Sequence, residues 1–240
     1  MKKIGVIGAM EVEVQTLASS MTGMDGKGEA ELIKSAHLSF YEGMLRGVRA
    51  VVVKSGVGKV NAAICAQRLI SEFGVTHIVN TGIAGAAASS LGVFDVVVST
   101  DAMYHDVDAT RFGYKPAQIP QMDTYRFPAD KELITAAEKA FAKTDAAKKH
   151  RLLKGRVASG DQFIADGKTK RRIKELCDPA CIEMEGAAIA HTCYVNDVPF
   201  VIIRAMSDAA DDNGGEAIAF NEKAAAEESA AIVIEMMKLL

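Results

Sequence analysis

Apolar residues along the chain fall into short continuous runs, separated by stretches in which apolar residues recur at helical spacing. Such short runs are typical of buried strands, whose two faces both contact other elements. Strands are predicted at residues 3–8, 75–81, 94–99, 152–158 and 198–206. A hairpin is predicted around Arg46-Gly47, joining residues 38–45 to residues 48–54.

Helical spacing appears between these runs, so strands and helices alternate throughout the chain. Helices are predicted at residues 9–17, from a glycine loop to about residue 73, and at 130–143, 168–176 and 217–240. This alternation predicts an α/β fold with a central mixed, largely parallel sheet in one domain, residues 1–240. The long irregular stretch at residues 101–127 is of a kind that usually covers a site or a partner surface.

Composition narrows the classes of function. The 240 residues are 49% hydrophobic with a formal charge of -3, which fits one large domain and disfavours non-specific nucleic-acid binding. No apolar run approaches the roughly 18 residues of a membrane span. The first apolar run breaks at Glu11, too early for a signal peptide, so a cytoplasmic protein is expected. Cys177 and Cys181 have neither redox-motif nor zinc-site spacing, and we expect no metal or cofactor.

The segment Ile182–His191 combines carboxylates with small apolar residues. Glu183 and Glu185 precede the run Gly186 to Ala190, whose small side chains allow a helix to pack closely on a sheet. Both acids are therefore expected on a strand-to-helix turn, on one face of the chain. Two such carboxylates repel each other unless they are hydrogen-bonded or used in chemistry. The alternative is a pair of solvated loop acids.

Other acids also follow predicted strands, and strand ends meet at one edge of an open α/β sheet. Glu13 and Asp208 are expected to converge there with Glu185, with Phe163 as an aromatic wall. Carboxylates without basic neighbours suit a substrate that becomes positive in its transition state, as a sugar does during glycosidic cleavage. Glu13 also has a simpler interpretation, because acidic residues favour helix starts.

Two further motifs receive structural interpretations. The loop Ser55-Gly-Val-Gly-Lys matches neither a P-loop nor the dinucleotide pattern, so a tight strand-to-helix turn is favoured. His105 beside Asp106 has the residue types of an acid/base pair. A loop histidine that only forms hydrogen bonds is the more common case, and it is the one we expect.

Taken together, several ordered motifs resemble those of one enzyme family. Six segments, spread from residue 4 to about residue 211, are similar to those of the bacterial 5′-methylthioadenosine/S-adenosylhomocysteine nucleosidases. They are IGVIGAMEVEV, KSGVGKVNAA, NTGIAGA, SGDQFI, IEMEGAAIAH and VIIRAMSDAAD. These belong to the purine nucleoside phosphorylase superfamily. The resemblance implies a three-layer α/β/α homodimer that hydrolyses the bond between adenine and a 5′-thio-ribose, in methionine salvage.

The resemblance also implies roles for individual residues. Glu13 matches the carboxylate that activates the attacking water, Asp208 matches the acid that protonates adenine at N7, and Glu185 matches the acceptor of the ribose hydroxyls. The remaining matches are substrate contacts: Phe163 stacks on adenine, the Ile164 backbone reads the purine edge, and the Met184 backbone and Ser207 lie beside the substrate. Phe112 and Pro120 match residues that reach into the partner subunit's site and cover the 5′-alkylthio tail.

Departures from the family pattern leave alternatives. Ile83 stands where these nucleosidases usually have serine, which puts in doubt a water or ribose contact. Phosphorylases on the same fold hold phosphate with an arginine and a serine, where this chain has Asn80 and Ile83. Water is therefore the expected acceptor. A nucleosidase for futalosine or 5′-deoxyadenosine and a non-catalytic nucleoside-binding protein remain as alternatives. Residues 210–217 are a candidate hinge.

Overall fold

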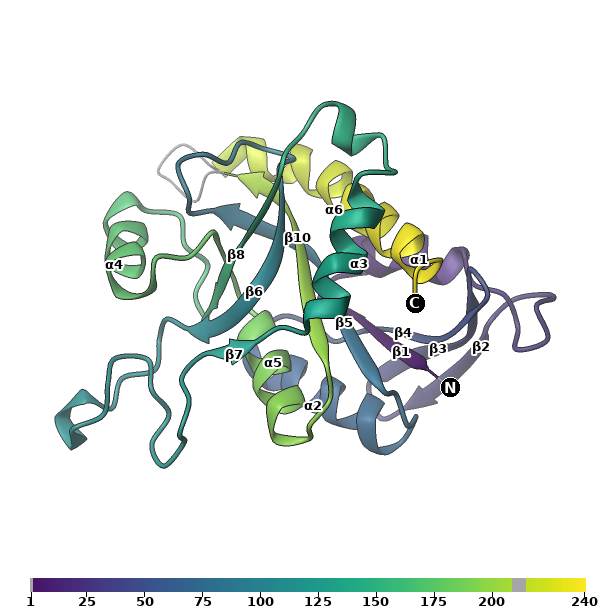
Figure 1. The fold of residues 1–240 in the computed structure, drawn as a ribbon, viewed down its shortest axis with the longest axis horizontal. Helices are drawn as coiled ribbons and strands as arrows, with labels where there is room; N and C mark the ends of the chain where they lie inside the picture. Colours follow the sequence, from purple (N-terminus) through teal and green to yellow (C-terminus); the bar gives the residue numbers. More distant parts are fainter. Residues whose placement is uncertain (1, 209–214) are drawn as a thin grey trace.

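The computed structural model describes residues 2–208 and 215–240, and for residues 215–220 it describes the backbone alone. A single mixed sheet contains strands from both halves of the chain (Figure 1). Its strands are β1 (Lys3–Gly8), β2 (Glu31–Ser35), β3 (Leu38–Leu45), β4 (Val48–Lys54), β5 (His77–Ala86), β6 (Val96–Tyr104), β7 (Phe127–Pro128), β8 (Leu152–Ser159), β9 (Cys181–Glu183) and β10 (Phe200–Asp208).

The sheet is mixed: antiparallel pairs join β10 to β6 and β5 to β9, and the hairpin strands β2, β3 and β4 are also antiparallel. The order is β10-β6-β8-β9-β5-β1-β4-β3-β2, and β10 also pairs with β5. The pairs β4–β1, β1–β5 and β5–β10 are parallel, as are β6–β8 and β8–β9. The fold class expected from the alternating pattern is confirmed.

Helices form the two outer layers. They are α1 (Glu11–Ser19), α2 (Lys59–Ser71), α3 (Lys131–Phe141), α4 (Gly167–Cys177), α5 (Gly186–Val195) and α6 (Gly215–Met237). Figure 1 shows α1, α3 and α6 on one side of the sheet and α2 and α5 on the other. Each side has its own apolar core, and alternate residues of a strand point into the two cores, as Val6 and Ile7 of β1 do.

Some boundaries differ from the sequence-based predictions. The strand predicted to end at residue 81 continues as β5 to Ala86, since the small residues from Gly82 onward pair with β10 and β9. β6 extends to Tyr104, into the stretch predicted to be irregular. β2 was not predicted, because its ELIKS sequence is mostly exposed and carries little apolar signal. The proposed hinge at 210–217 falls largely outside the described residues.

Chain direction decides which strand ends meet. β1, β5 and β10 are parallel, so Gly8, Ala86 and Asp208 end at the same edge. β9 also reaches this edge, although it runs antiparallel to β5, because its Ile182 pairs with Gly85 near the carboxyl end of β5. This pairing brings the turn after Glu183 to the carboxyl end of β5. Figure 1 shows the segment between β6 and β7 projecting from the sheet at the lower left.

Candidate active site

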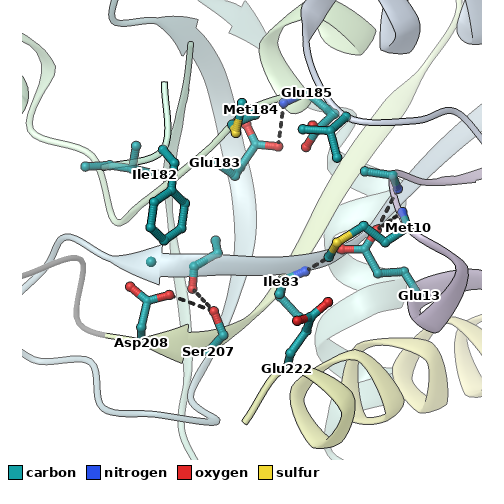
Figure 2. Close-up of a pocket in the computed structure, with 15 residues that line it drawn as sticks. Met10, Glu13, Ile83, Ile182, Glu183, Met184, Glu185, Ser207, Asp208 and Glu222 are labelled. Atoms are coloured by element: carbon teal, nitrogen blue, oxygen red, sulfur yellow. Dashed lines mark hydrogen bonds between the residues drawn. The ribbon is translucent and has the colours of Figure 1, made fainter. Parts of the chain in front are cut away.

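A cavity of about 270 Å³ opens at this edge of the sheet. Figure 2 shows Asp208 and Ser207 on one side, Glu13 on the opposite side and Glu185 across from Glu222. Apart from the Ser207 hydroxyl, the side chains of the described lining residues are apolar or acidic, and none of these residues is basic. The complete lining is Ala9, Met10, Glu13, Val57, Ile83, Ala84, Gly85, Phe163, Ile182, Glu183, Met184, Glu185, Ser207, Asp208 and Glu222.

Glu13 is buried in the first turn of α1, with 4% of its surface exposed. Its Oε2 accepts from the backbone N–H groups of Ala9 at 2.5 Å and Met10 at 2.9 Å, and its Oε1 accepts from Ile83 N–H at 3.0 Å. Burial raises the pKa of Glu13, against the opposing effects of Arg204 and of these three donors. Glu13 therefore both caps the start of α1 and faces the cavity.

Glu185 lies directly before α5 and is 6% exposed. Its Oε1 accepts from the Gly58 N–H at 2.8 Å, so the glycine loop before α2 holds this carboxylate. Burial raises the pKa of Glu185 to about 8, and the nearby Glu183 carboxylate adds to the rise. This contact could not be predicted from the sequence, because a backbone donor in a glycine turn leaves no side-chain signal.

Glu183 has a structural partner that was not predicted. Its carboxylate forms a buried ion pair with Arg204 at 2.5 Å and accepts from the backbone N–H of Glu185 and Gly186. The hydroxyl of Ser159 also donates to it. The alternative of two solvated loop acids is therefore wrong, since Glu183 is 6% exposed. Each of its oxygens is held, so it supports the turn at Glu185.

Arg204 corrects the expectation of a site lacking basic groups. It lies within β10 with 2% of its surface exposed, and its guanidinium contacts Glu183 and Asn80 Oδ1, each at 2.5 Å. It lies behind the cavity and does not line it. The signal was present in the sequence, because a charge inside an otherwise apolar strand requires a buried partner.

Asp208 is the last residue of β10 and is 8% exposed. The Ser207 hydroxyl donates to its Oδ2 at 2.8 Å. The backbone carbonyl of Ser207 accepts from Asn221 at 3.3 Å, which ties the strand end to α6. Figure 2 shows Asp208 and Glu13 at opposite sides of one cavity. The strand end thus presents a carboxyl group to one end of a bound molecule.

The wall near Asp208 contains the predicted aromatic residue. Phe163 lines the cavity, and 63% of its surface is exposed. A small adjoining space is lined by Phe163, Ile164, Met184 and Asp208, among others. Ile164 is buried at 7% exposure and contributes to this space but not to the main cavity. These residues enclose a small space beside the Asp208 carboxyl group.

Ile83 lines the cavity beside Glu13, where its backbone N–H is one of the three donors to that carboxylate. Gly82 approaches the same group, because a Cβ built on Gly82 would overlap the Glu13 carboxylate. Asn80 is buried and donates to the Ile7 carbonyl at 2.9 Å. Asn80 is therefore used in packing and does not reach the cavity.

Three residues from the sequence analysis lie outside the cavity. Phe112, in a short 3-10 helix, is 84% exposed, and Pro120 is also exposed. His105 is 1% exposed, and its ring nitrogens have no hydrogen-bond partner among the described residues. The neighbouring Asp106 accepts from Lys59 at 2.7 Å instead, so no His105–Asp106 pair faces the cavity.

The cavity can bind a small, largely neutral molecule and surround it with carboxyl groups. Within the described part of the chain, no group of three His, Cys, Asp or Glu residues is placed to hold a metal ion. No helix among residues 2–208 and 215–240 is long and apolar enough to cross a membrane. Glu222 of α6 and Val57 are lining residues that the sequence analysis did not identify.

Comparison with known proteins places this geometry in a family. A model of the phosphorylase superfamily matches residues 3–238. The 5′-methylthioadenosine/S-adenosylhomocysteine nucleosidase of Staphylococcus haemolyticus is 43% identical over 240 residues, covering 99% of this chain and 100% of the relative. The Neisseria meningitidis nucleosidase, solved with methylthio-immucillin-A, is 39% identical with a TM-score of 0.92 and full coverage of both chains.

The Colwellia psychrerythraea nucleosidase, solved in complex with adenine, is 36% identical with a TM-score of 0.92 and covers 100% of this chain and 96% of its own. These likenesses extend over nearly the whole chain in sequence and in fold. The chain therefore belongs to the phosphorylase superfamily and, within it, to the 5′-methylthioadenosine/S-adenosylhomocysteine nucleosidase family.

Proposed function

We propose that this protein hydrolyses the N-glycosidic bond of 5′-methylthioadenosine and S-adenosylhomocysteine, releasing adenine and the 5′-thio-ribose. The observation that carries the proposal is the placement of two carboxyl groups, Glu13 and Asp208, at opposite sides of one small cavity. One end suits a leaving base and the other suits an attacking water. A relative named as a 5′-methylthioadenosine/S-adenosylhomocysteine nucleosidase matches 99% of this chain, which supports the substrate class.

Asp208 is the proposed general acid. A proton delivered to N7 of adenine lets the base leave as a neutral molecule, and such proton transfers typically accelerate a reaction about a hundredfold to ten-thousandfold. The Ser207 hydroxyl, 2.8 Å from Oδ2, orients the carboxyl group. Phe163 and Ile164 provide the wall on which the purine lies, with Phe163 stacking on its face and the Ile164 backbone contacting its edge.

Glu13 is the proposed base for the attacking water. Its raised pKa makes it a stronger proton acceptor than an ordinary glutamate. The three N–H donors fix the carboxylate in place and leave it no freedom to turn away. Its negative charge also faces the ribose as the sugar develops oxocarbenium character.

Glu185 is the proposed acceptor of the ribose hydroxyls, with the Met184 backbone beside it. A protonated Glu185 in the empty site releases its proton, or shares it, when hydroxyl groups donate to it. Ile83 replaces a polar contact by an apolar one next to the water position. Hydrolysis then relies on Glu13 alone to orient the water.

Water is the proposed acceptor in place of phosphate. A phosphate dianion requires cationic partners, and the lining contains none, while Arg204 is committed to Glu183. Residues 209–220, whose side chains are not described, contain no lysine or arginine. The expected sugar product is therefore the free 5′-thio-ribose and not its 1-phosphate.

We also propose that the protein works as a homodimer in the cytoplasm, in methionine salvage. Large apolar side chains are exposed on α2, on α5 and in the segment before β7: Val60, Ile64, Tyr194, Val195 and Phe112. Val57 belongs both to this surface and to the cavity wall, so a partner covering the surface would also close the cavity. In this arrangement Phe112 and Pro120 reach the partner subunit's site.

An adenine-release assay in phosphate-free buffer tests the reaction. We expect release from both nucleosides, unchanged by added phosphate, and a sugar product without phosphate. Asp208→Asn is expected to bind substrate with nearly unchanged affinity and to lose turnover by about a hundredfold or more, because the base must then leave without a proton. A strict phosphate requirement would contradict the hydrolase, and near wild-type turnover of Asp208→Asn would contradict the general acid.

A further inference from the structure

Glu222 is a carboxylate of the cavity wall to which the proposed reaction gives no part. It extends from α6 toward the cavity on the side of Ile83, across from Glu185 (Figure 2). Its side chain is partly buried, and it forms no hydrogen bond or ion pair with any of the residues that the structure describes. A carboxylate in a largely apolar wall is costly unless a partner is provided.

The other acids of the cavity already have partners. Glu13 accepts from three backbone N–H groups, Glu185 accepts from Gly58, and Asp208 accepts from Ser207. Glu183 is paired with Arg204. Glu222 differs from these in that its oxygens are available to a bound molecule.

The position of Glu222 identifies the part of the substrate that it meets, if the proposed function holds. A nucleoside with its base at Asp208 and its ribose hydroxyls at Glu185 has one part left, the substituent at C5′. The wall left for that substituent is formed by Met10, Val57, Ile83 and Glu222. In this arrangement Met10, Val57 and Ile83 contact the substrate's sulfur atom and the neighbouring methylene. Glu222 is the charged group of this wall.

The two substrates differ only in this substituent. The methylthio group of 5′-methylthioadenosine is neutral and gains nothing from a nearby carboxylate. The homocysteine tail of S-adenosylhomocysteine carries an α-carboxylate and an α-ammonium group, and the ammonium group is a good hydrogen-bond donor to a carboxylate. No basic side chain among the described lining residues is placed to receive the α-carboxylate, which therefore lies at the mouth of the cavity beside Val57.

We propose that Glu222 binds the α-ammonium group of the homocysteine tail and thereby sets the preference for S-adenosylhomocysteine over 5′-methylthioadenosine. The contact involves the substrate tail and is remote from the bond that breaks. It therefore changes the ratio of the two kcat/KM values and leaves the chemistry on the smaller substrate intact.

Steady-state kinetics of Glu222→Gln on both nucleosides tests the assignment. We expect kcat/KM for S-adenosylhomocysteine to fall about tenfold, the loss typical of one charge-assisted hydrogen bond, with a change below about twofold for 5′-methylthioadenosine. Turnover of the methylthio substrate by the same preparation shows that the variant is folded. Glu227→Gln removes the same charge from an exposed position of α6 and is expected to leave the ratio unchanged.

A third substrate separates the ammonium contact from tail length. The analogue of S-adenosylhomocysteine that lacks the amino group is expected to react equally well with wild type and Glu222→Gln. An unchanged ratio for the two natural substrates overturns the proposal. So does an equal fall on both, because Glu222 would then face the cationic ribose. Failure of the proposed function is distinct, since wild type would then release adenine from neither.

Discussion

Replacing Glu185 by glutamine is predicted to change how the stability of the empty protein depends on pH. Burial, together with the neighbouring Glu183 carboxylate, raises the pKa of Glu185 from 4.5 to about 8. Between these two values the folded protein holds a proton that the unfolded chain has released. Stability contributed by this proton is fully present below about pH 4.5 and is lost as pH rises to about 8.

The magnitude follows from the two pKa values. Linkage gives a loss of about 2 to 3 kcal/mol in the free energy of unfolding between pH 6 and pH 9. Glutamine has nearly the same shape as protonated glutamate, and its Oε1 can still accept from the Gly58 N–H. Glu185→Gln should therefore gain stability relative to wild type as the pH rises, and its advantage should grow by about 2 to 3 kcal/mol between pH 6 and pH 9.

Urea unfolding of wild type and Glu185→Gln at pH 6, 7, 8 and 9 measures this difference, without substrate. All other titrating groups are common to the two proteins, so their effects cancel in the comparison. Glu175→Gln, at an exposed position of α4, provides a matched control and should follow the wild-type curve. Parallel curves for wild type and Glu185→Gln would refute the reasoning, since Glu185 would then be ionised in the folded protein throughout.

Two further changes test the support of the site. Gly82→Ala places a Cβ against the Glu13 carboxylate and should displace this base, lowering kcat for adenine release about tenfold or more. As a control, Gly92→Ala should keep wild-type turnover, because its Cβ would meet no atom closer than 3.9 Å. If Gly82→Ala keeps wild-type turnover, Glu13 need not be held in place for catalysis. Arg204→Met leaves Glu183 buried without its partner and should cost about 3 to 5 kcal/mol in urea unfolding, and the double variant with Glu183→Gln should recover part of it. No recovery would place the loss in packing and not in the unpaired charge.

The local pattern of the sequence was sufficient to predict most of the framework. Apolar runs identified the central strands, which are buried on both faces, and helical spacing of apolar residues identified the long helices, which are buried along one face. The same pattern placed Glu13 and Asp208 directly after strands and Glu185 on a strand-to-helix turn, and the structure brings these acids to one cavity. The mostly exposed strand β2 carries no such pattern.

Tertiary structure alone decided how those acids are held and what surrounds them. Arg204 lies behind Glu183 because β10 and the turn after β9 meet across the sheet, and their order in the sequence does not show that contact. The Gly58 N–H reaches Glu185 from a loop 127 positions away. Glu222 faces the cavity only because α6 crosses the end of β10. Backbone donors and long-range partners depend on chain direction and packing, so the sequence determined which groups are present, and the fold determined their partners, their burial and hence their pKa values.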